Sequence, residues 1–134
     1  TQTNDNPVYY IQYAYARISS IFRILQLDIK TKIKSDKNSS LNNHELQILK
    51  KLSQWPQCIE ISLNKFEPHR ITYYLYDLVT LFHSYWNMGK DNEEFRFIGR
   101  DKTFNSHKLI LLQSLAIVIE NGMSLLGVST PKRM

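Results

Sequence analysis

The spacing of apolar residues constrains the fold of this chain more than any other sequence feature, because it follows the period of a helix along most of the length. One such set, in the first thirty residues, is Ile11, Tyr15, Ile18, Phe22 and Leu25. A second set is Ile71, Leu75, Leu78, Phe82 and Tyr85, and a third is Leu109, Leu112, Ala116, Ile119 and Met123. No segment shows the sustained alternation of a strand. The pattern therefore predicts an all-α fold, a single helical bundle of about five helices.

Capping residues predict where the first helices begin and end. Asn6 can accept from free N–H groups and Pro7 fits the first helical position, so a helix begins there. We expect it to continue through residues 30–34 into polar sequence. Asn42 and Glu45 then have the spacing of a capping box, which predicts the start of a second helix.

Proline and glycine mark the later boundaries. Pro56 interrupts the second helix, and a short amphipathic helix follows with Ile59, Leu63 and Phe66 on one face. A fourth helix starts at Pro68. Further boundaries are predicted at Ser106, as the cap of the last helix, and at Gly127, as its left-handed end.

Length and composition limit the class of protein. A chain of 134 residues with 43% apolar content supports one domain, residues 1–134, with a core of its own. Cys58 is the one cysteine, which excludes a disulfide framework and a cysteine-based zinc site and is typical of a small core residue in a reducing compartment. The most apolar run, residues 109–119, is shorter than the roughly 20 residues of a membrane span, so we expect no membrane association and a cytoplasmic protein.

The charge is positive but modest. Lys and Arg number 17 against 12 Asp and Glu, a net charge of +5, and the excess lies toward the two ends of the chain. This balance favours an anionic partner, although a solvated surface accounts for it as well.

Motifs of catalysis and cofactor binding are absent from the sequence. There is no phosphate-binding glycine loop and no zinc-protease or serine-hydrolase motif. The four histidines are scattered, none four residues from another, which is typical of capping or surface positions: His44, His69, His83 and His107. We therefore predict no catalytic residue, no metal ligand and no cofactor site in this chain.

The tyrosines suggest binding. All 8 lie in two stretches, residues 9–15 and 73–85. In the first stretch Tyr10, Tyr13 and Arg17 form a stripe apart from the apolar face. A tyrosine ring beside a guanidinium is suited to unstacked bases, because the ring stacks and the cation contacts phosphate or a base edge. The alternative is that Tyr10 and Tyr13 pack under another helix with their hydroxyls outward.

Three stretches together resemble arginyl-tRNA synthetases. They are NPVYYIQYAYARI at residues 6–18, EPHRITYYLYDL with FHSYWN within residues 67–87, and NGMSLLGVSTPKRM at residues 121–134. They resemble the C-terminal anticodon-binding domain of these enzymes, the kind named for a DALR motif, in order and at suitable spacing. Tyr15 departs from the family, which commonly has His at this position, and residues 28–40 and 88–105 match loosely.

The resemblance implies an α-helical bundle that grips the anticodon stem-loop of tRNA(Arg). The full-length enzyme is a class I ligase that joins arginine to its tRNA with ATP and magnesium. Its catalytic domain, with the HIGH-type and KMSK-type signatures, is then expected before Thr1, and this chain alone is expected to be inactive. By position, the implied RNA contacts are Tyr13, Arg17, Arg23, Tyr85 and Met134.

Further expectations concern individual residues. Tyr85 is expected at the solvent end of its helix, with the chain's tail ordered against it. Met134 would bring an apolar side chain and a carboxylate that accepts from base amino groups. Some members of the family have a Trp one turn beyond the position of Tyr85; Gly89 takes that place here, which leaves Trp86 as the substitute. Arg70 is expected to be structural.

Two alternatives remain open from the sequence. One is the helical anticodon domain of another class I synthetase, such as the cysteinyl or methionyl enzyme, against which the QYAYAR stretch and Arg133-Met134 argue. The other is a helical protein-interaction module whose tyrosines contact a partner protein.

Overall fold

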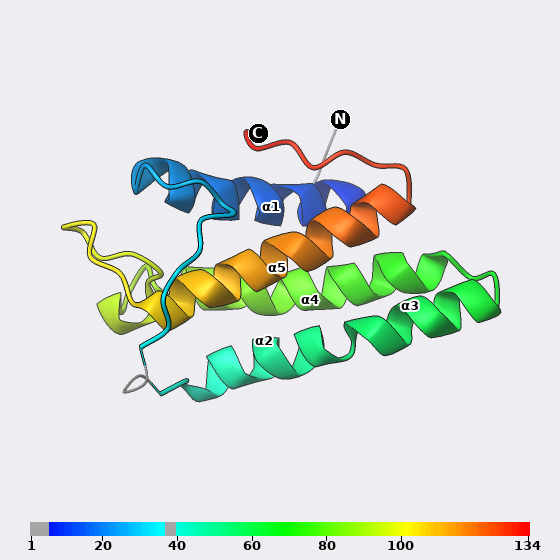
Figure 1. The fold of residues 1–134 in the computed structure, drawn as a ribbon, viewed down its shortest axis with the longest axis horizontal. Coiled ribbons are helices and arrows are strands. Elements are labelled where there is room, and N and C mark those ends of the chain that lie inside the picture. Colours follow the sequence, from blue (N-terminus) through cyan, green and yellow to red (C-terminus); the bar gives the residue numbers. More distant parts are fainter. Residues whose placement is uncertain (1–5, 37–39) are drawn as a thin grey trace.

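The computed structural model of the chain describes residues 6–36 and 40–134, and all the named elements in these ranges are helices (Figure 1). Within these ranges its elements are α1 (Pro7–Ile24), α2 (Asn43–Ser53), α3 (Trp55–Asn64), α4 (His69–Met88), the short 3-10 helix η1 (Glu93–Phe95) and α5 (Ser106–Leu125). The expected all-α bundle is confirmed.

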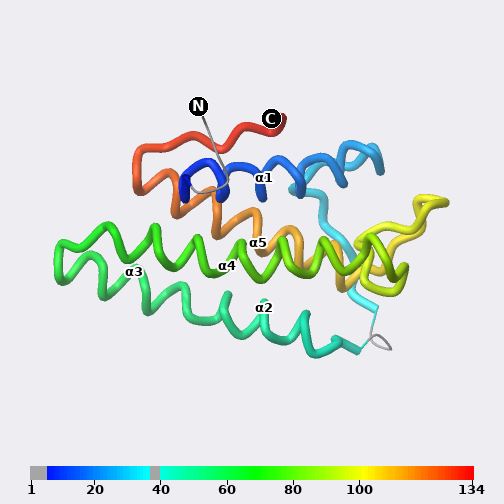
Figure 2. The backbone as a smooth tube through the Cα atoms, turned by 180° about the vertical axis from the view of Figure 1, so that it is seen from behind, coloured from blue at the N-terminus to red at the C-terminus, as the bar shows by residue number. Residues whose placement is uncertain are grey.

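Helix α4 lies at the centre of the bundle and contacts the four other α-helices. Helices α2 and α3 follow one another along one side of α4, while α1 and α5 pack on the other sides (Figures 1 and 2). After α5 the last residues turn back and lie along α1, as both views show. These last residues, 126–134, form the C-terminal tail, which thus lies beside α1 although the two are at opposite ends of the described sequence.

The core consists of the apolar faces expected from the sequence. Ile18, Phe82 and Leu112 are among its fully buried side chains. At Gly122 the helices approach so closely that a Cβ would lie 2.7 Å from Cδ1 of Leu75. Helix α5 is long and apolar enough to cross a membrane by length and composition, but ten of its residues are buried among α1, α2 and α4.

Helix α1 is shorter than expected, because it ends at Ile24 rather than continuing through residues 30–34. Gln26 adopts a left-handed conformation, with φ 57°. Its N–H donates to the Arg23 carbonyl, and the Leu27 N–H donates to the Phe22 carbonyl at 2.9 Å. These two bonds form a Schellman end, which here does not use the usual glycine.

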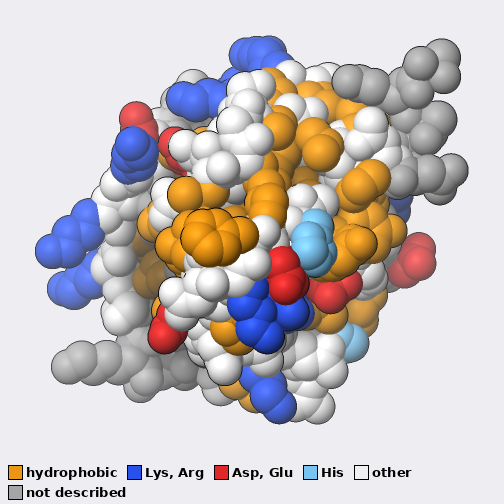
Figure 3. Space-filling view, turned by 90° about the vertical axis from the view of Figure 1, so that its right-hand side faces the viewer, with side chains coloured by type: hydrophobic (Ala, Val, Ile, Leu, Met, Phe, Trp, Pro, Cys, Tyr) orange, Lys and Arg blue, Asp and Glu red, His pale blue; other side chains and the backbone are white. Residues whose placement is uncertain are grey.

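The end of α3 carries a second difference from expectation. Leu63 and Phe66 are exposed, Phe66 to 89%, so only part of the expected amphipathic face is covered. Phe66 is also left-handed, with φ 53°, and forms another Schellman end through Glu67, whose N–H donates to the Ser62 carbonyl. Figure 3 shows this end of the bundle, where hydrophobic side chains lie among charged ones.

The other capping predictions agree with the structure, with one exception. The Asn6 side chain accepts from the N–H groups of the first turn of α1, and Asn42 and Glu45 form the expected capping box. Gly127 has φ 74° and ends α5. The exception is Ser106, which lies inside α5, because the N-cap position is occupied by Asn105.

The long connection between α4 and α5 is held down by a buried lysine. Lys108 of α5 is 5% exposed, and its Nζ donates to the carbonyl oxygens of Glu94 and, at 2.9 Å, of Arg96. Arg96 in turn donates from Nε to the Gly89 carbonyl at 2.6 Å. These bonds fasten the connection to both α4 and α5.

Candidate nucleic-acid interface

A hollow of about 250 Å³ lies between α1 and the C-terminal tail. Its lining consists of Tyr13, Ala16, Arg17, Ser20, Arg23, Lys132, Arg133 and Met134. The structure thus brings together four of the five residues that the resemblance implied as RNA contacts: Tyr13, Arg17, Arg23 and Met134. They come from one face of α1 and from the tail, more than 100 residues apart in the sequence.

Two side chains of α1 form the centre of this surface. The Arg17 guanidinium carbon lies 4.6 Å from the centroid of the Tyr13 ring and 4.9 Å from that of Trp86 on α4. Tyr13 also stacks on Tyr9, at 6.4 Å between ring centroids. The guanidinium is therefore held between two aromatic rings, a favourable arrangement for a cation.

His83 lies beneath Arg17 and is 4% exposed. The expectation that it is a capping or surface histidine is wrong, because α1 covers it. Its Nδ1 lies 3.0 Å from Nη1 of Arg17, and its Nε2 lies 3.3 Å from the carbonyl oxygen of Tyr10. Burial lowers the pKa of His83 to about 4; the Tyr10 carbonyl raises it and the Arg17 charge lowers it further.

The tail is placed by contacts with α1. Gln12 donates from Nε2 to the Ser129 carbonyl at 2.9 Å, and Arg23 donates from Nη1 to the Lys132 carbonyl at 3.4 Å. The tail therefore follows α1 toward the C-terminal end of that helix (Figure 1). The expectation that it is ordered against the Tyr85 end of α4 is not met. Met134 is 50% exposed at the rim of the hollow.

Tyr85 is not at the solvent end of its helix. It is 1% exposed, and its hydroxyl donates to Oε2 of Glu45 at 2.9 Å and accepts from Nδ2 of Asn42 at 3.1 Å. Burial is the main cause of its raised pKa. Since its ring stacks on Phe97 inside the core, Tyr85 has no surface to offer a ligand in this structure.

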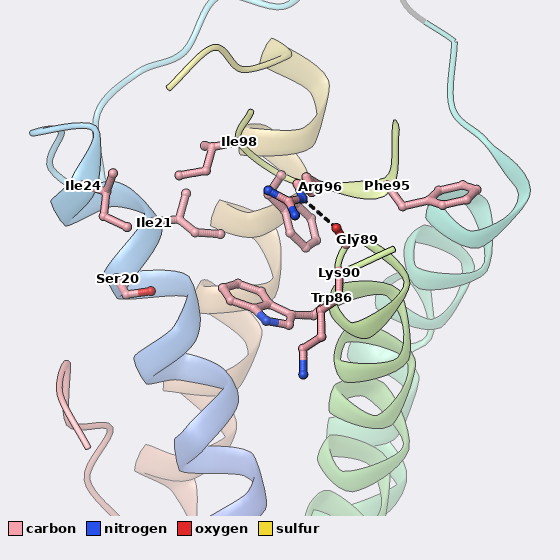
Figure 4. A pocket seen from close by; sticks show the side chains of 10 residues that line it. Ser20, Ile21, Ile24, Trp86, Gly89, Lys90, Phe95, Arg96 and Ile98 are labelled. Carbon is pink, nitrogen blue, oxygen red and sulfur yellow. Dashed lines mark hydrogen bonds between the residues drawn. The ribbon is translucent and has the colours of Figure 1, made fainter. Parts of the chain in front are cut away.

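Trp86, one residue later, faces the surface where Tyr85 was expected. It lines a mostly apolar pocket of about 270 Å³ between the C-terminal ends of α1 and α4 (Figure 4). Ile24 of α1 and Ile98 of the α4–α5 connection line the side of the pocket opposite Trp86. Arg96 lies above the indole ring in the view of Figure 4. Ser20 lines both this pocket and the hollow beside the tail, so the two are neighbours.

Tyr10 shows that the packing alternative holds for part of the tyrosine stripe. Its ring lies 5.2 Å from Tyr76 and 4.5 Å from His83, both on α4. Tyr10 therefore joins α1 to α4, whereas Tyr13 lies beside the hollow.

The side-chain charges around the hollow are positive. Arg17, Arg23, Lys132 and Arg133 line it without an acidic side chain. In the described part of the chain no group of three or more His, Cys, Asp or Glu could hold a metal ion. Ring faces beside several cations are suited to stacking bases and contacting phosphates.

Arg70, expected to be structural, bonds within the bundle. Its Nε donates to Oε2 of Glu67 at 2.6 Å, at the start of α4 and away from the hollow.

Comparison with known proteins places this geometry in context. The chain is 46% identical to the arginine–tRNA ligase of Pelagibacter ubique over 99% of its own length, and 37% identical to that of Rhizobium meliloti. It spans 23% and 24% of the lengths of these relatives. The arginyl-tRNA synthetase of Thermus thermophilus has the same fold, with a TM-score of 0.79 and 24% identity over 98% of this chain and 22% of that one. The family model of the DALR anticodon binding domain matches residues 11–134, and the chain belongs to this family.

Proposed function

We propose that this chain binds the anticodon stem-loop of tRNA(Arg) and is the RNA-binding part of a longer arginine–tRNA ligase. The observation that carries the proposal is the hollow in which the tail brings Met134 beside Tyr13, Arg17 and Arg23. Stacking on the Tyr13 ring and phosphate contacts from the arginines are the interactions that single-stranded loop nucleotides offer.

The geometry also extends the proposed contact surface. Trp86 replaces Tyr85 as the aromatic residue of α4 that meets RNA, because its ring flanks Arg17 while Tyr85 is buried. The pocket beside Trp86 is open to a base that leaves the stack of the loop.

The longer ligase supplies the chemistry in this proposal. Arginylation with ATP and magnesium belongs to a catalytic domain outside these 134 residues, and the enzyme works in the cytoplasm. The relatives reported above are both arginine–tRNA ligases, which favours the arginine enzyme over the cysteinyl or methionyl one. A protein-interaction module receives no comparable support.

The first test changes the two central residues. Tyr13→Ala is expected to weaken binding of the arginine anticodon stem-loop by about 1–3 kcal/mol, because it removes a stacking ring. Arg17→Ala is expected to lower the slope of log affinity against log salt by roughly 0.7–0.9, because it removes one phosphate-neutralising cation. Fluorescence anisotropy with a labelled stem-loop over a range of salt measures both.

The control separates binding from folding. Ile18 is fully buried on the opposite side of α1, so Ile18→Ala is expected to cost roughly 2–5 kcal/mol of stability. Tyr13→Ala should melt cooperatively near the temperature of the unmodified chain. Loss of helicity in Tyr13→Ala would mean that this ring is a core residue and not a contact.

The second test concerns the tail. Deleting residues 132–134 removes two cations and Met134 from the hollow, so we expect weaker stem-loop binding and a salt slope smaller by up to roughly 1.5. The melting temperature should change little, because these residues are exposed. A C-terminal tag, which moves the Met134 carboxylate, should also weaken binding, whereas an N-terminal tag should not. If the deletion variant and the C-terminally tagged chain bound the stem-loop as tightly as the unmodified chain, the tail would have no part in RNA binding.

The third test concerns activity. Neither the HIGH-type nor the KMSK-type signature of the catalytic domain occurs in the sequence. The 134-residue chain alone is therefore expected to show no arginine-dependent ATP–pyrophosphate exchange. Exchange by the purified chain above the level of a heat-denatured sample would contradict the assignment of catalysis to another domain.

A further inference from the structure

One buried polar side chain of the candidate interface, His83, has no role in the RNA contacts proposed above. His83 lies under α1, with the Tyr10 ring at 4.5 Å and the Tyr13 ring at 5.6 Å between centroids. An apolar side chain would fill this position at the α1–α4 contact without the cost of burying an imidazole. Unlike an apolar side chain, the imidazole forms hydrogen bonds with Arg17 and with the Tyr10 carbonyl.

The bonding pattern determines which nitrogen carries the proton. Arginine can only donate, so Nδ1 of His83 must accept from Nη1 of Arg17, at 3.0 Å. Nε2 then carries the proton and donates to the Tyr10 carbonyl at 3.3 Å. The imidazole is therefore neutral, and α1 holds it in a single tautomer from both sides.

A neutral acceptor has a specific advantage at this position. The ion pairs found among the described residues join other side chains, and none involves Arg17. Held by an imidazole, the guanidinium keeps its full charge, and among the described residues this bond uses one of its five N–H donors. A carboxylate would orient it equally well but would neutralise the charge that a phosphate requires.

We propose that His83 is a positioning residue for RNA recognition, whose neutral imidazole holds the Arg17 guanidinium between the rings of Tyr13 and Trp86. The inference rests on the proposed function, since it assigns to Arg17 a contact with the stem-loop. The same bond links α1 to α4, because it joins Arg17 of one helix to His83 of the other.

The charged and titratable groups around His83 are few. From α1 it meets Arg17 and the rings of Tyr10 and Tyr13, and on its own helix the ring in contact with it is Phe82. Trp86 of the same helix flanks Arg17. Protonation of Nδ1 would set a second donor and a second positive charge against Arg17. The bond can therefore exist only while the imidazole is neutral.

The first measurement needs no RNA. A long-range proton–nitrogen spectrum of the 134-residue chain at pH 7 should show His83 with its proton on Nε2, and Nδ1 as an acceptor. A proton on Nδ1 would overturn the inference whatever the chain binds.

The second measurement is a double-mutant cycle with the arginine anticodon stem-loop. His83→Leu removes the acceptor and puts an apolar side chain in its place, so it should weaken binding about tenfold, as expected for losing one charge-assisted hydrogen bond through Arg17. Arg17→Ala in the His83→Leu background should add less than about twofold. His83→Asn, whose Oδ1 can take the place of Nδ1, should restore most of the affinity.

Controls and outcomes keep the inference distinct from the proposed function. His69→Asn, at an exposed position of α4, should bind as the unmodified chain does. Additive effects of His83→Leu and Arg17→Ala, or full affinity of His83→Leu, would overturn the positioning role while stem-loop binding stands. Should His83→Leu not fold, His83→Asn and the spectrum still decide. Absence of binding by the unmodified chain would overturn both proposals.

Discussion

Replacing Glu45 with alanine is expected to lower the free energy of unfolding by about 3–5 kcal/mol. The carboxylate is 1% exposed and accepts at 2.9 Å both from the Tyr85 hydroxyl and from the Asn42 backbone N–H. Nε2 of His107 lies 3.4 Å away. The substitution leaves the buried Tyr85 hydroxyl and the half-buried Asn42 N–H without their acceptor, and it destroys the capping box. Urea unfolding followed by circular dichroism at pH 7 measures the change.

Two other variants show whether the loss comes from this network. Glu45→Gln keeps the volume and one acceptor oxygen, so it should cost distinctly less than Glu45→Ala. Glu60→Ala, at an exposed position of α3, should change stability by less than about 0.5 kcal/mol. If Glu45→Ala were as mild as Glu60→Ala, the buried hydrogen bonds of Tyr85 would contribute nothing to stability.

Acid should destabilise the fold through His83 before most carboxylates titrate. The pKa of His83 is about 4 in the folded chain and near 6.5 when unfolded, so the unfolded state binds the extra proton. The stability due to the neutral imidazole is fully present above about pH 6.5 and is lost as the pH falls toward 4. The loss amounts to up to about 3 kcal/mol, given that the side chain is 4% exposed.

A variant that cannot titrate isolates this contribution. Unfolding free energies of the unmodified chain and of His83→Asn, measured at intervals from pH 7.5 to 4, should converge as the pH falls. Parallel curves would mean that His83 takes up its proton without loss of stability. That result would contradict the buried, hydrogen-bonded imidazole described above.

The sequence was sufficient to predict the fold because its signals are local. Apolar spacing placed Ile18, Phe82 and Leu112 in the core, and Asn42 with Glu45 formed the predicted capping box. The errors arose where a helix end lacks its usual residue. Gln26 and Phe66 occupy left-handed positions that glycine normally takes, so composition gave no sign that α1 ends at Ile24 or that Phe66 turns outward.

The candidate site was predictable in part. Tyr13 and Arg17 form a stripe on one helix, which periodicity alone reveals. The same periodicity placed Tyr85 on the core face, whereas its assignment to the solvent end ignored that its hydroxyl could find a partner on α2. Trp86 and His83 were missed as neighbours of Arg17, because those contacts join residues 69 and 66 positions apart in the sequence. No local pattern reports such pairs.

The bonds of Lys108 have a consequence for how the stem-loop would associate. Because the α4–α5 connection is fastened at Glu94 and Arg96, the wall of the Trp86 pocket exists before any ligand arrives. A pre-organised wall loses little conformational entropy on binding, so association with the stem-loop would not require the α4–α5 connection to become ordered first. Discrimination between anticodons is then expected to show mainly in how long each complex lasts, with similar association rates for right and wrong loops.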